Sequence, residues 1–318
     1  MAGEERAVPA GGRGASAAAG TPATAGLPAI AGLPAIAGDT AVVGLVGHPV
    51  AHSLSPAMQN VAFAACRLPW VYVAFDVEPQ FIAPAIGGAR ALGLRGLNVT
   101  APHKGAAARF VDRRVGAAAV LGLVNTIVFT GGEAVGYETD GAGFLAACAD
   151  HGLQVVPGLR AVVAGAGGAG VLIAQALLGA GARVVLANRD RGRLEDAAAR
   201  LAAASPGREL AAIPLDDPGL AVELAHADLF VNATSSADLV VAGFEPARLA
   251  LATRVADVAY RPAETLLLRA VRGRGLTAWN GLGMLVHQGA ASFTLWTGKA
   301  APIAAMAQAV GYTELAAE

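Results

Sequence analysis

Residues 160 to 170 read RAVVAGAGGAG, an apolar strand that runs directly into a glycine-rich turn. Gly165, Gly167 and Gly170 have the spacing G-x-G-x-x-G, and a helical run continues to Leu178. In this setting the first glycine permits a tight turn, the second lets the backbone approach a pyrophosphate, and the third lets the helix pack on the strand. The stretch therefore predicts a dinucleotide site at a helix N-terminus, where free N–H groups favour anions.

On both sides of this stretch, short β-branched runs alternate with Ala-rich runs, which is typical of βαβ units around a parallel sheet. We expect strands at 41–46, 70–77, 94–99, 161–164, 183–187, 228–232, 254–258 and 276–279, and helices at 56–66, 79–91, 105–112, 141–150, 283–297 and 301–310. Residues 124–137 predict a hairpin that turns at Gly131 and Gly132. The length of 318 residues and this pattern predict an α/β protein with two domains.

Composition excludes several classes of protein. The chain has 23 Lys plus Arg against 24 Asp plus Glu, a formal net charge of −1, so we expect no nucleic-acid partner. It is 55% hydrophobic, but 41 glycines and 17 prolines interrupt every apolar run, whereas a membrane-spanning helix needs roughly 20 apolar residues. Cys66 and Cys148 lack a CxxC spacing and are expected to be buried free thiols in a reducing cytoplasm.

The end of the second strand after the glycine turn favours NADP over NAD. An NAD site usually has an acidic residue there, but this strand ends in Asn188, Arg189 and Asp190, with Arg191 and Arg193 next. Guanidinium groups bind a 2′-phosphate well. The alternative is that Arg191 and Arg193 lie on a solvated helix start that Asp190 caps. Asn188 argues against a methyltransferase, which carries an acidic residue at this point.

Polar residues also lie at the ends of strands in the first half of the chain. Ser53 and Ser55 follow the first strand in GHPVAHSLSP and would share a side if the segment is extended. Ser55 before Pro56 is equally a good helix N-cap. Lys104 and Asp140 lie at element ends in a chain with only 15% charged residues, and this makes them candidates for an acid/base pair.

The sequence resembles the shikimate dehydrogenase family, including the quinate/shikimate dehydrogenases, over about residues 41–310. The matching segments, in the family's order, are GHPVAHSLSP, LNVTAPHK, GLVNT, ETDGAGF, GAGGAG, ANRDRGR, VNATS, DVAYRP and NGLGMLVHQGA. The resemblance implies a dehydrogenase that uses NADPH to reduce 3-dehydroshikimate reversibly to shikimate in aromatic amino acid (chorismate) biosynthesis. Quinate or an aminoshikimate is the alternative substrate, and a non-catalytic dinucleotide or ligand sensor is the alternative class.

The resemblance also implies roles for individual residues. Catalysis falls to Lys104 and Asp140. The substrate-binding residues match Ser53, Ser55, Thr100, Lys104, Asn125, Asp140, Tyr260 and Gln288. The cofactor-binding residues match Gly165, Ala166, Gly167, Gly168, Ala169, Asn188, Arg189, Asp190, Arg193, Val258 and Gly281. In the family the serines and the tyrosine hold the substrate carboxylate, and the threonine and the glutamine contact ring hydroxyls.

The resemblance places Gln288, which belongs to the last long helix, at the substrate. We therefore expect that helix to return to the first domain, so that both domains line the cleft that separates them. The expected division is a disordered Ala/Gly/Pro-rich tail over 1–38, a substrate domain over 39–140 plus 285–318, and an NADP-binding Rossmann domain over 141–284. The partner is a small-molecule substrate, with no membrane, and the chain is a monomer or a homodimer. No metal-ligand spacing accompanies the histidines, so no metal site is expected.

The nicotinamide supplies hydride, so the protein has to manage one proton. An ammonium at Lys104 would stabilise and protonate the carbonyl oxygen while Asp140 orients it. Alternatively, Asp140 relays the proton and Lys104 only stabilises charge. Three residues depart from the family pattern: His103 replaces a common Phe, Gln59 a common His, and Glu138 a common Asn. The added carboxylate of Glu138 is expected either to alter the protonation of Lys104 or to select a substrate with an amino group.

Overall fold

The computed structural model describes residues 36–234 and 245–315, and the strands within them form two sheets of six strands each. Most of the expected tail, residues 1–35, and the last residue of the VNATS segment lie outside the described residues. The strands are β1 (Ala41–Gly47), β2 (Trp70–Asp76), β3 (Gly96–Val99), β4 (Arg113–Arg114), β5 (Thr126–Thr130), β6 (Glu133–Tyr137), β7 (Arg160–Ala164), β8 (Arg183–Asn188), β9 (Leu210–Pro214), β10 (Leu229–Asn232), β11 (Arg254–Asp257) and β12 (Ala278–Trp279). The helices are α1 (Ser55–Ala65), α2 (Ile82–Ala91), α3 (Lys104–Ala107), α4 (Ala117–Leu121), α5 (Asp140–Asp150), α6 (Gly168–Gly179), α7 (Arg191–Ala204), α8 (Gly219–Ala225), α9 (Leu266–Gly273), α10 (Leu282–Thr297) and α11 (Ile303–Val310), with 3₁₀ turns η1 (Pro79–Phe81) and η2 (Pro246–Arg248).

The second sheet has the order β12-β11-β10-β7-β8-β9 and is parallel throughout. Counted from β7, this is the doubly wound order 3-2-1-4-5-6, in which ligands bind beyond the carboxyl ends of the strands at the switch between β7 and β10. Separate hydrophobic clusters cover its two faces. Strands covered on both faces read as continuous apolar runs, which is why β7 and β8 were recognisable in the sequence.

The first sheet has the order β2-β1-β3-β5-β6-β4. β1 pairs in parallel with β2 and β3, and the hairpin β5–β6 adds antiparallel pairs next to β3. The hairpin turns at Gly131 and Gly132, both with positive φ, as predicted. Helices α1, α10 and α11 cover one face and α2 and α4 the other, each over its own apolar cluster.

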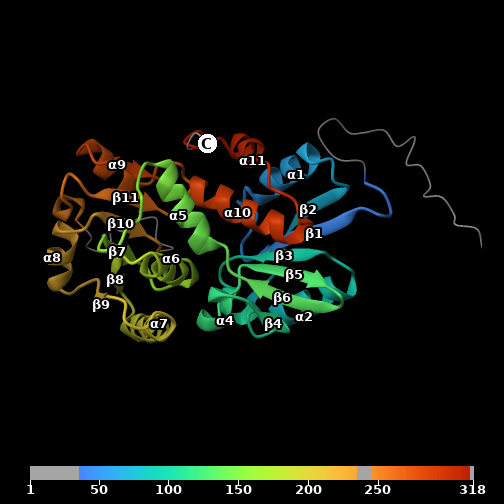
Figure 1. Cartoon of the computed structure of the whole chain (residues 1–318), viewed down its shortest axis with the longest axis horizontal. Helices are drawn as coiled ribbons and strands as arrows, with labels where there is room; N and C mark the ends of the chain where they lie inside the picture. Colours follow the sequence, from blue (N-terminus) through green and yellow to red (C-terminus); the bar gives the residue numbers. More distant parts are fainter. Residues whose placement is uncertain (1–35, 235–244, 316–318) are drawn as a thin grey trace, which may run out of the picture.

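Helices α5 and α10 run between the two sheets (Figure 1). α5 follows β6 and leads to β7, and α10 follows β12 and returns to the first sheet, where Trp296 Nε1 donates to the carbonyl of Ile127 at 3.0 Å. A Cβ on Gly143 of α5 would lie 2.7 Å from the backbone N of Gln288 on α10. The missing side chain therefore lets the two connecting helices pack closely.

The helix predicted over 105–112 is wrong in its length, since α3 ends at Ala107. Asp112 instead anchors the chain to β6, because its N–H donates to the carbonyl of Ala134 and its carboxylate accepts from the N–H of Ala134 at 2.7 Å. β4, α4, β9, α8 and α9 were not predicted, and α7 was anticipated only in the alternative in which Asp190 caps a helix start. Both cysteines are free, as expected, but Cys148 is buried whereas Cys66 is only half-buried.

Candidate active site

A cavity of about 310 Å³ lies where the carboxyl ends of β1 and β3 face the N-terminus of α6. The residues that line it come from both the first sheet with its helices (the first α/β unit) and the second sheet with its helices (the second α/β unit). The cavity is therefore a cleft between the two units. Twelve of the residues predicted as site residues line this cavity: Ser53, Ser55, Thr100, Lys104, Asn125, Asp140, Gly168, Ala169, Val258, Tyr260, Gly281 and Gln288. Seven others do not: Gly165, Ala166, Gly167, Asn188, Arg189, Asp190 and Arg193.

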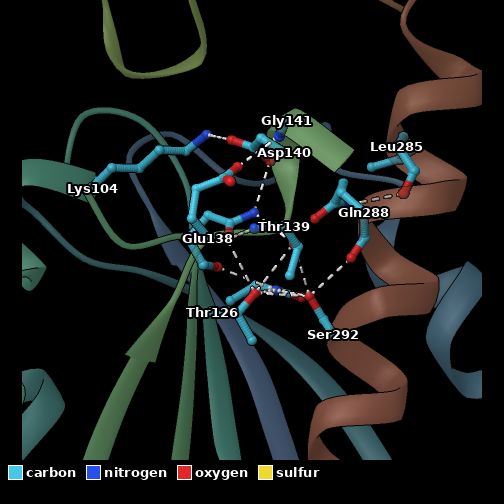
Figure 2. Close-up of polar contacts among 11 residues, drawn as sticks. Lys104, Thr126, Glu138, Thr139, Asp140, Gly141, Leu285, Gln288 and Ser292 are labelled. Atoms are coloured by element: carbon cyan, nitrogen blue, oxygen red, sulfur yellow. Dashed lines mark hydrogen bonds and ion pairs between the residues drawn. The ribbon is translucent and has the colours of Figure 1, made fainter. Parts of the chain in front are cut away.

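Lys104 and Asp140 are the first residues of α3 and α5, and the fold brings them into contact. Lys104 Nζ donates to Asp140 Oδ2, and the two side chains are only 14% and 6% exposed (Figure 2). Low exposure strengthens their attraction and limits the access of water. The pair can therefore hold a proton at a defined point in the cleft.

Asn125 fixes the other oxygen of Asp140. Its Nδ2 donates to Asp140 Oδ1 at 2.7 Å and to Thr139 Oγ1 at 2.9 Å, while its Oδ1 accepts from the N–H of Thr139 at 2.9 Å. The backbone of Asn125 is also held on both sides, by the N–H of Val99 and the carbonyl of Tyr137. With both carboxylate oxygens held, Asp140 has little freedom to turn away from Lys104.

Glu138 lies directly beside this pair but does not line the cavity. Its Oε1 accepts from the N–H of Gly141, in the first turn of α5, at 2.6 Å. Burial raises the pKa of Glu138 to about 7, the negative charge of Asp140 adds to the rise, and the N–H of Gly141 and the ammonium of Lys104 oppose it. Because Glu138 is not part of the cavity lining, the geometry shows no contact through which it would select a substrate amino group.

The two serines line the cavity from the loop after β1. The segment is not extended as the alternation argument assumed: it turns, and Ser53 Oγ accepts from the N–H of Ser55 at 3.2 Å. The predicted cap role of Ser55 is wrong, because α1 begins at Ser55 after the N-cap residue Leu54, and no side chain caps it. The Ser55 side chain instead makes a hydrogen bond with Tyr72, at the edge of the cavity.

Tyr260 follows β11 in the second unit, and it reaches the serine loop of the first. Burial raises the pKa of Tyr260, and hydrogen bonds with Ser53 and with the backbone of Leu54 offset part of this rise. Gln288 reaches the cavity from α10, where its Nε2 donates to the carbonyl of Leu285 at 2.9 Å. Residues far apart in sequence therefore meet around one small volume.

A buried polar network adjoins the cavity, and its central residue, Asn98, lines the cavity but was not predicted as a site residue. Asn98 Nδ2 donates to Ser292 Oγ at 2.9 Å and to Thr126 Oγ1 at 3.1 Å, and its Oδ1 accepts from Tyr72 at 2.8 Å. Ser292 also donates to the carbonyl of Gln288 at 3.0 Å. The only available signal was an Asn within the apolar strand β3, whereas Ser292 lies in an otherwise ordinary helix.

The glycine turn has the geometry that its spacing predicts. Gly165 has φ +115°, which favours glycine, and a Cβ on Gly170 would lie 1.9 Å from the carbonyl oxygen of Gly165. A Cβ on Gly167 would meet no atom within 4 Å, so its backbone faces open space. Asn188 Oδ1 accepts from the N–H of Ala166 at 3.3 Å and joins the end of β8 to this turn.

The charged residues after β8 differ in whether a partner within the protein holds them. Asp190 is the N-cap of α7 and accepts from the N–H of Arg193 at 3.0 Å, so the cap alternative is correct for this residue. Arg191 pairs with Asp216 at 3.0 Å. Arg189 and Arg193 are exposed. Within the described residues, no group of three or more His, Cys, Asp or Glu side chains is placed to hold a metal ion.

The departures at Gln59 and His103 are both buried, and Oε1 of Gln59 has no hydrogen-bond partner among the described residues. Gln59 is fully buried and donates to the carbonyl of Gly289 at 2.9 Å, and His103 Nε2 contacts the carbonyl of Val77 at 2.7 Å. Neither lines the cavity.

In the part of the chain that the structure describes, every helix is too short or too polar to cross a membrane.

The chain is similar to known proteins over most of its length. Three family models match the chain: the shikimate dehydrogenase substrate binding domain at residues 45–127, shikimate / quinate 5-dehydrogenase at 148–257, and the shikimate 5′-dehydrogenase C-terminal domain at 281–310. A shikimate dehydrogenase (NADP(+)) of Symbiobacterium thermophilum is 46% identical, over 83% of this chain and 91% of that protein. A crystal structure of a shikimate dehydrogenase in complex with NADP+ is 36% identical with a TM-score of 0.80, covering 89% of this chain and 99% of that one. The shikimate 5-dehydrogenase of Thermus thermophilus in complex with NADP(H) and shikimate is 34% identical with a TM-score of 0.75, covering 85% and 98%.

Proposed function

The chain belongs to the shikimate dehydrogenase family, and we propose that it catalyses the reversible, NADP-dependent reduction of 3-dehydroshikimate to shikimate. The contact of Lys104 with Asp140, inside a cleft that faces the glycine turn, carries this proposal. A dehydrogenase acting on a CH–OH group needs a proton-handling group beside its cofactor site, and a binding protein does not. This observation therefore favours the enzyme over the non-catalytic sensor.

The turn at residues 165–170 fits a dinucleotide. The positive φ of Gly165, the lack of room for a side chain at Gly170 and the open space at Gly167 are the three features that a pyrophosphate site requires. When bound, NADPH supplies the hydride. The residues proposed to hold it are Gly165, Ala166, Gly167, Gly168, Ala169, Asn188, Arg189, Asp190, Arg193, Val258 and Gly281.

The proposed proton donor in ketone reduction is the Lys104 ammonium. Negative charge develops on the carbonyl oxygen, and a positioned ammonium stabilises that charge and then supplies the proton. Asp140, held by Asn125, keeps the ammonium in place, and one of its carboxylate oxygens is proposed to accept a further hydrogen bond from the neighbouring hydroxyl. In the alternative assignment Asp140 relays the proton, and the lysine substitution in the Discussion separates the two.

The remaining cavity residues are proposed to hold the rest of the substrate. Ser53, Ser55 and Tyr260 form a group of hydroxyls that suits a carboxylate, because O–H donors to a charged acceptor make strong hydrogen bonds. Thr100 and Gln288 line the same cavity and are proposed to contact the ring hydroxyls.

We further propose the domain division 39–140 plus 285–318 for substrate and 141–284 for NADP, with a tail over 1–38. Its support is that α5 and α10 are the connections between the sheets. A reducing cytoplasm is proposed because both cysteines are free. A monomer or a homodimer is the proposed assembly.

The test follows the absorbance of NADPH with purified protein and shikimate, quinate or an aminoshikimate, each with NADP and with NAD. We expect the highest kcat/KM with shikimate and NADP. Faster turnover of quinate or the amino analogue would replace the proposed substrate. Tight NADPH binding without turnover of any compound would make the protein a sensor.

A further inference from the structure

The N-terminus of α5 carries two carboxylates, and the proposed proton transfer uses only one of them. Asp140 lines the cavity and holds Lys104, whereas Glu138 lies beside this pair but outside the cavity lining. Figure 2 shows the two carboxylates and the ammonium close together. A half-buried acid beside a catalytic pair is electrostatically costly, since burial penalises its charge and Asp140 repels it.

The carboxylate of Glu138 is held in place rather than free. Its Oε1 accepts from the N–H of Gly141 at 2.6 Å, and the N–H of Asp140 also stabilises its charged form. A carboxylate at a helix N-terminus is favoured by the free N–H groups and the helix dipole. Its orientation is therefore fixed with respect to the first turn of α5, and so with respect to Asp140.

The charged groups that face Glu138 are few. They are Asp140, the first residue of α5, and Lys104, the first residue of α3. α6 presents no charge here. A Cβ added to Gly141 would lie 3.4 Å from Glu138 Oε2, and its neighbours from α6 would be the Ala176 methyl group and the Leu172 carbonyl, which are both uncharged. The ionisation of Glu138 therefore acts mainly on the catalytic pair.

We propose that Glu138 is a positioning residue that sets the pH range of the Lys104–Asp140 pair, by placing a second negative charge beside the ammonium once it ionises. This inference rests on the proposed function. An ionised Glu138 favours the ammonium form of Lys104 by Coulomb attraction. Ketone reduction, which uses the ammonium, then persists to higher pH, and alcohol oxidation, which uses the neutral amine, begins at higher pH.

The test uses Glu138→Gln, which can still accept from the N–H of Gly141 but carries no charge, and Glu138→Ala, which loses both features. In Glu138→Gln we expect the alkaline limb of kcat for ketone reduction and the acid limb for shikimate oxidation both to move to lower pH, by about one pH unit. If Glu138 is only a helix cap, Glu138→Gln will keep the wild-type profile and only Glu138→Ala will change. That result would overturn the inference.

A second measurement does not require turnover. The chain has only two lysines, Lys104 and Lys299, so ¹³C-lysine NMR of the whole protein gives two side-chain signals that Lys299→Met assigns. The Lys104 signal should show an inflection near pH 7, absent in Glu138→Gln and absent from Lys299. A wild-type protein without turnover but with this inflection would defeat the proposed function and keep the electrostatic coupling. A Lys104 signal indifferent to Glu138 would defeat the coupling itself.

Discussion

The aliphatic part of Lys104 packs against the backbone of Gly168, the first residue of α6. A Cβ on Gly168 would lie 3.2 Å from Cδ of Lys104 and 3.7 Å from its Cβ. Lys104 belongs to the first α/β unit and Gly168 to the second. The proposed proton donor is thus positioned both by the carboxylate it contacts and by the turn that is proposed to hold the cofactor.

Gly168→Ala should lower kcat several-fold, because the added methyl group displaces the Lys104 chain by a few tenths of an ångström, and small misplacements are costly in catalysis. Gly167→Ala is the matched control, since a Cβ there meets no protein atom. It should raise the KM for NADPH while leaving kcat nearly unchanged. Steady-state kinetics of both variants test this, and equal effects on kcat would contradict it.

Lys104→Met should reduce kcat about 10²–10⁴-fold with little change in the Kd for NADPH, because a positioned acid contributes on that scale. Lys299→Met, an exposed lysine outside the cavity, is the control and should match the wild type. Fluorescence titration with NADPH measures Kd. A residual, pH-dependent turnover in Lys104→Met that disappears in Asp140→Asn would instead support the proton relay through Asp140.

Arg189→Gln and Arg193→Gln should each raise the KM for NADPH about tenfold, a loss of about 1.4 kcal/mol of binding free energy, and change the KM for NADH little. Arg191→Gln should have a smaller effect, because this guanidinium pairs with Asp216. The comparison of NADPH with NADH isolates the 2′-phosphate. A larger effect at Arg191 would reassign the contact.

Glu138→Gln should stabilise the protein at pH 8 by about 2 kcal/mol, and by almost nothing at pH 4. The folded-state pKa of Glu138 is raised from 4.5 to about 7. Its contribution to stability is therefore fully present below pH 4.5 and is lost as the pH rises through 7, because the folded protein resists the ionisation that the unfolded chain accepts. Urea unfolding of the wild type and of Glu138→Gln at the two pH values measures the change in unfolding free energy. An equal change at pH 8 and at pH 4 would contradict a raised pKa of Glu138.

Ser292→Ala should destabilise the fold by about 1–2 kcal/mol, since it removes a buried hydrogen-bond partner of Asn98 and Thr126. The KM for shikimate should also rise, because the bonds of Ser292 to Asn98 of β3 and Thr126 of β5 hold α10, which carries Gln288, against the sheet. Thr294→Ala is the control: this residue makes a similar bond to the carbonyl four residues earlier but is exposed. Its unfolding free energy should change by less than about 0.5 kcal/mol.

Local patterns in the sequence predicted the elements with the strongest signals. β7 and β8 are apolar because both faces of their sheet are covered, the Gly131–Gly132 turn needs positive φ, and Asp190 has a cap's spacing. Elements with weak local patterns were not predicted or were predicted with the wrong length. β9 is a short edge strand whose LAAIP sequence contains one β-branched residue. The helix expected over 105–112 ends at Ala107, and Asp112 pairs instead with Ala134, more than 20 residues away.

The sequence by itself determined that a dinucleotide fold follows residue 160 and that Lys104, Asp140 and the serines were candidates for chemistry, because these conclusions depend on residue type and local spacing. Only the tertiary structure decided what each candidate touches. The turn at Ser53 removed the cap role of Ser55, the packing of α10 brought Ser292 to Asn98 at the cavity, and the first turn of α5 placed Glu138 beside the pair but outside the cleft. Such contacts depend on how two sheets and their connecting helices pack across long sequence separations, and no local pattern encodes them.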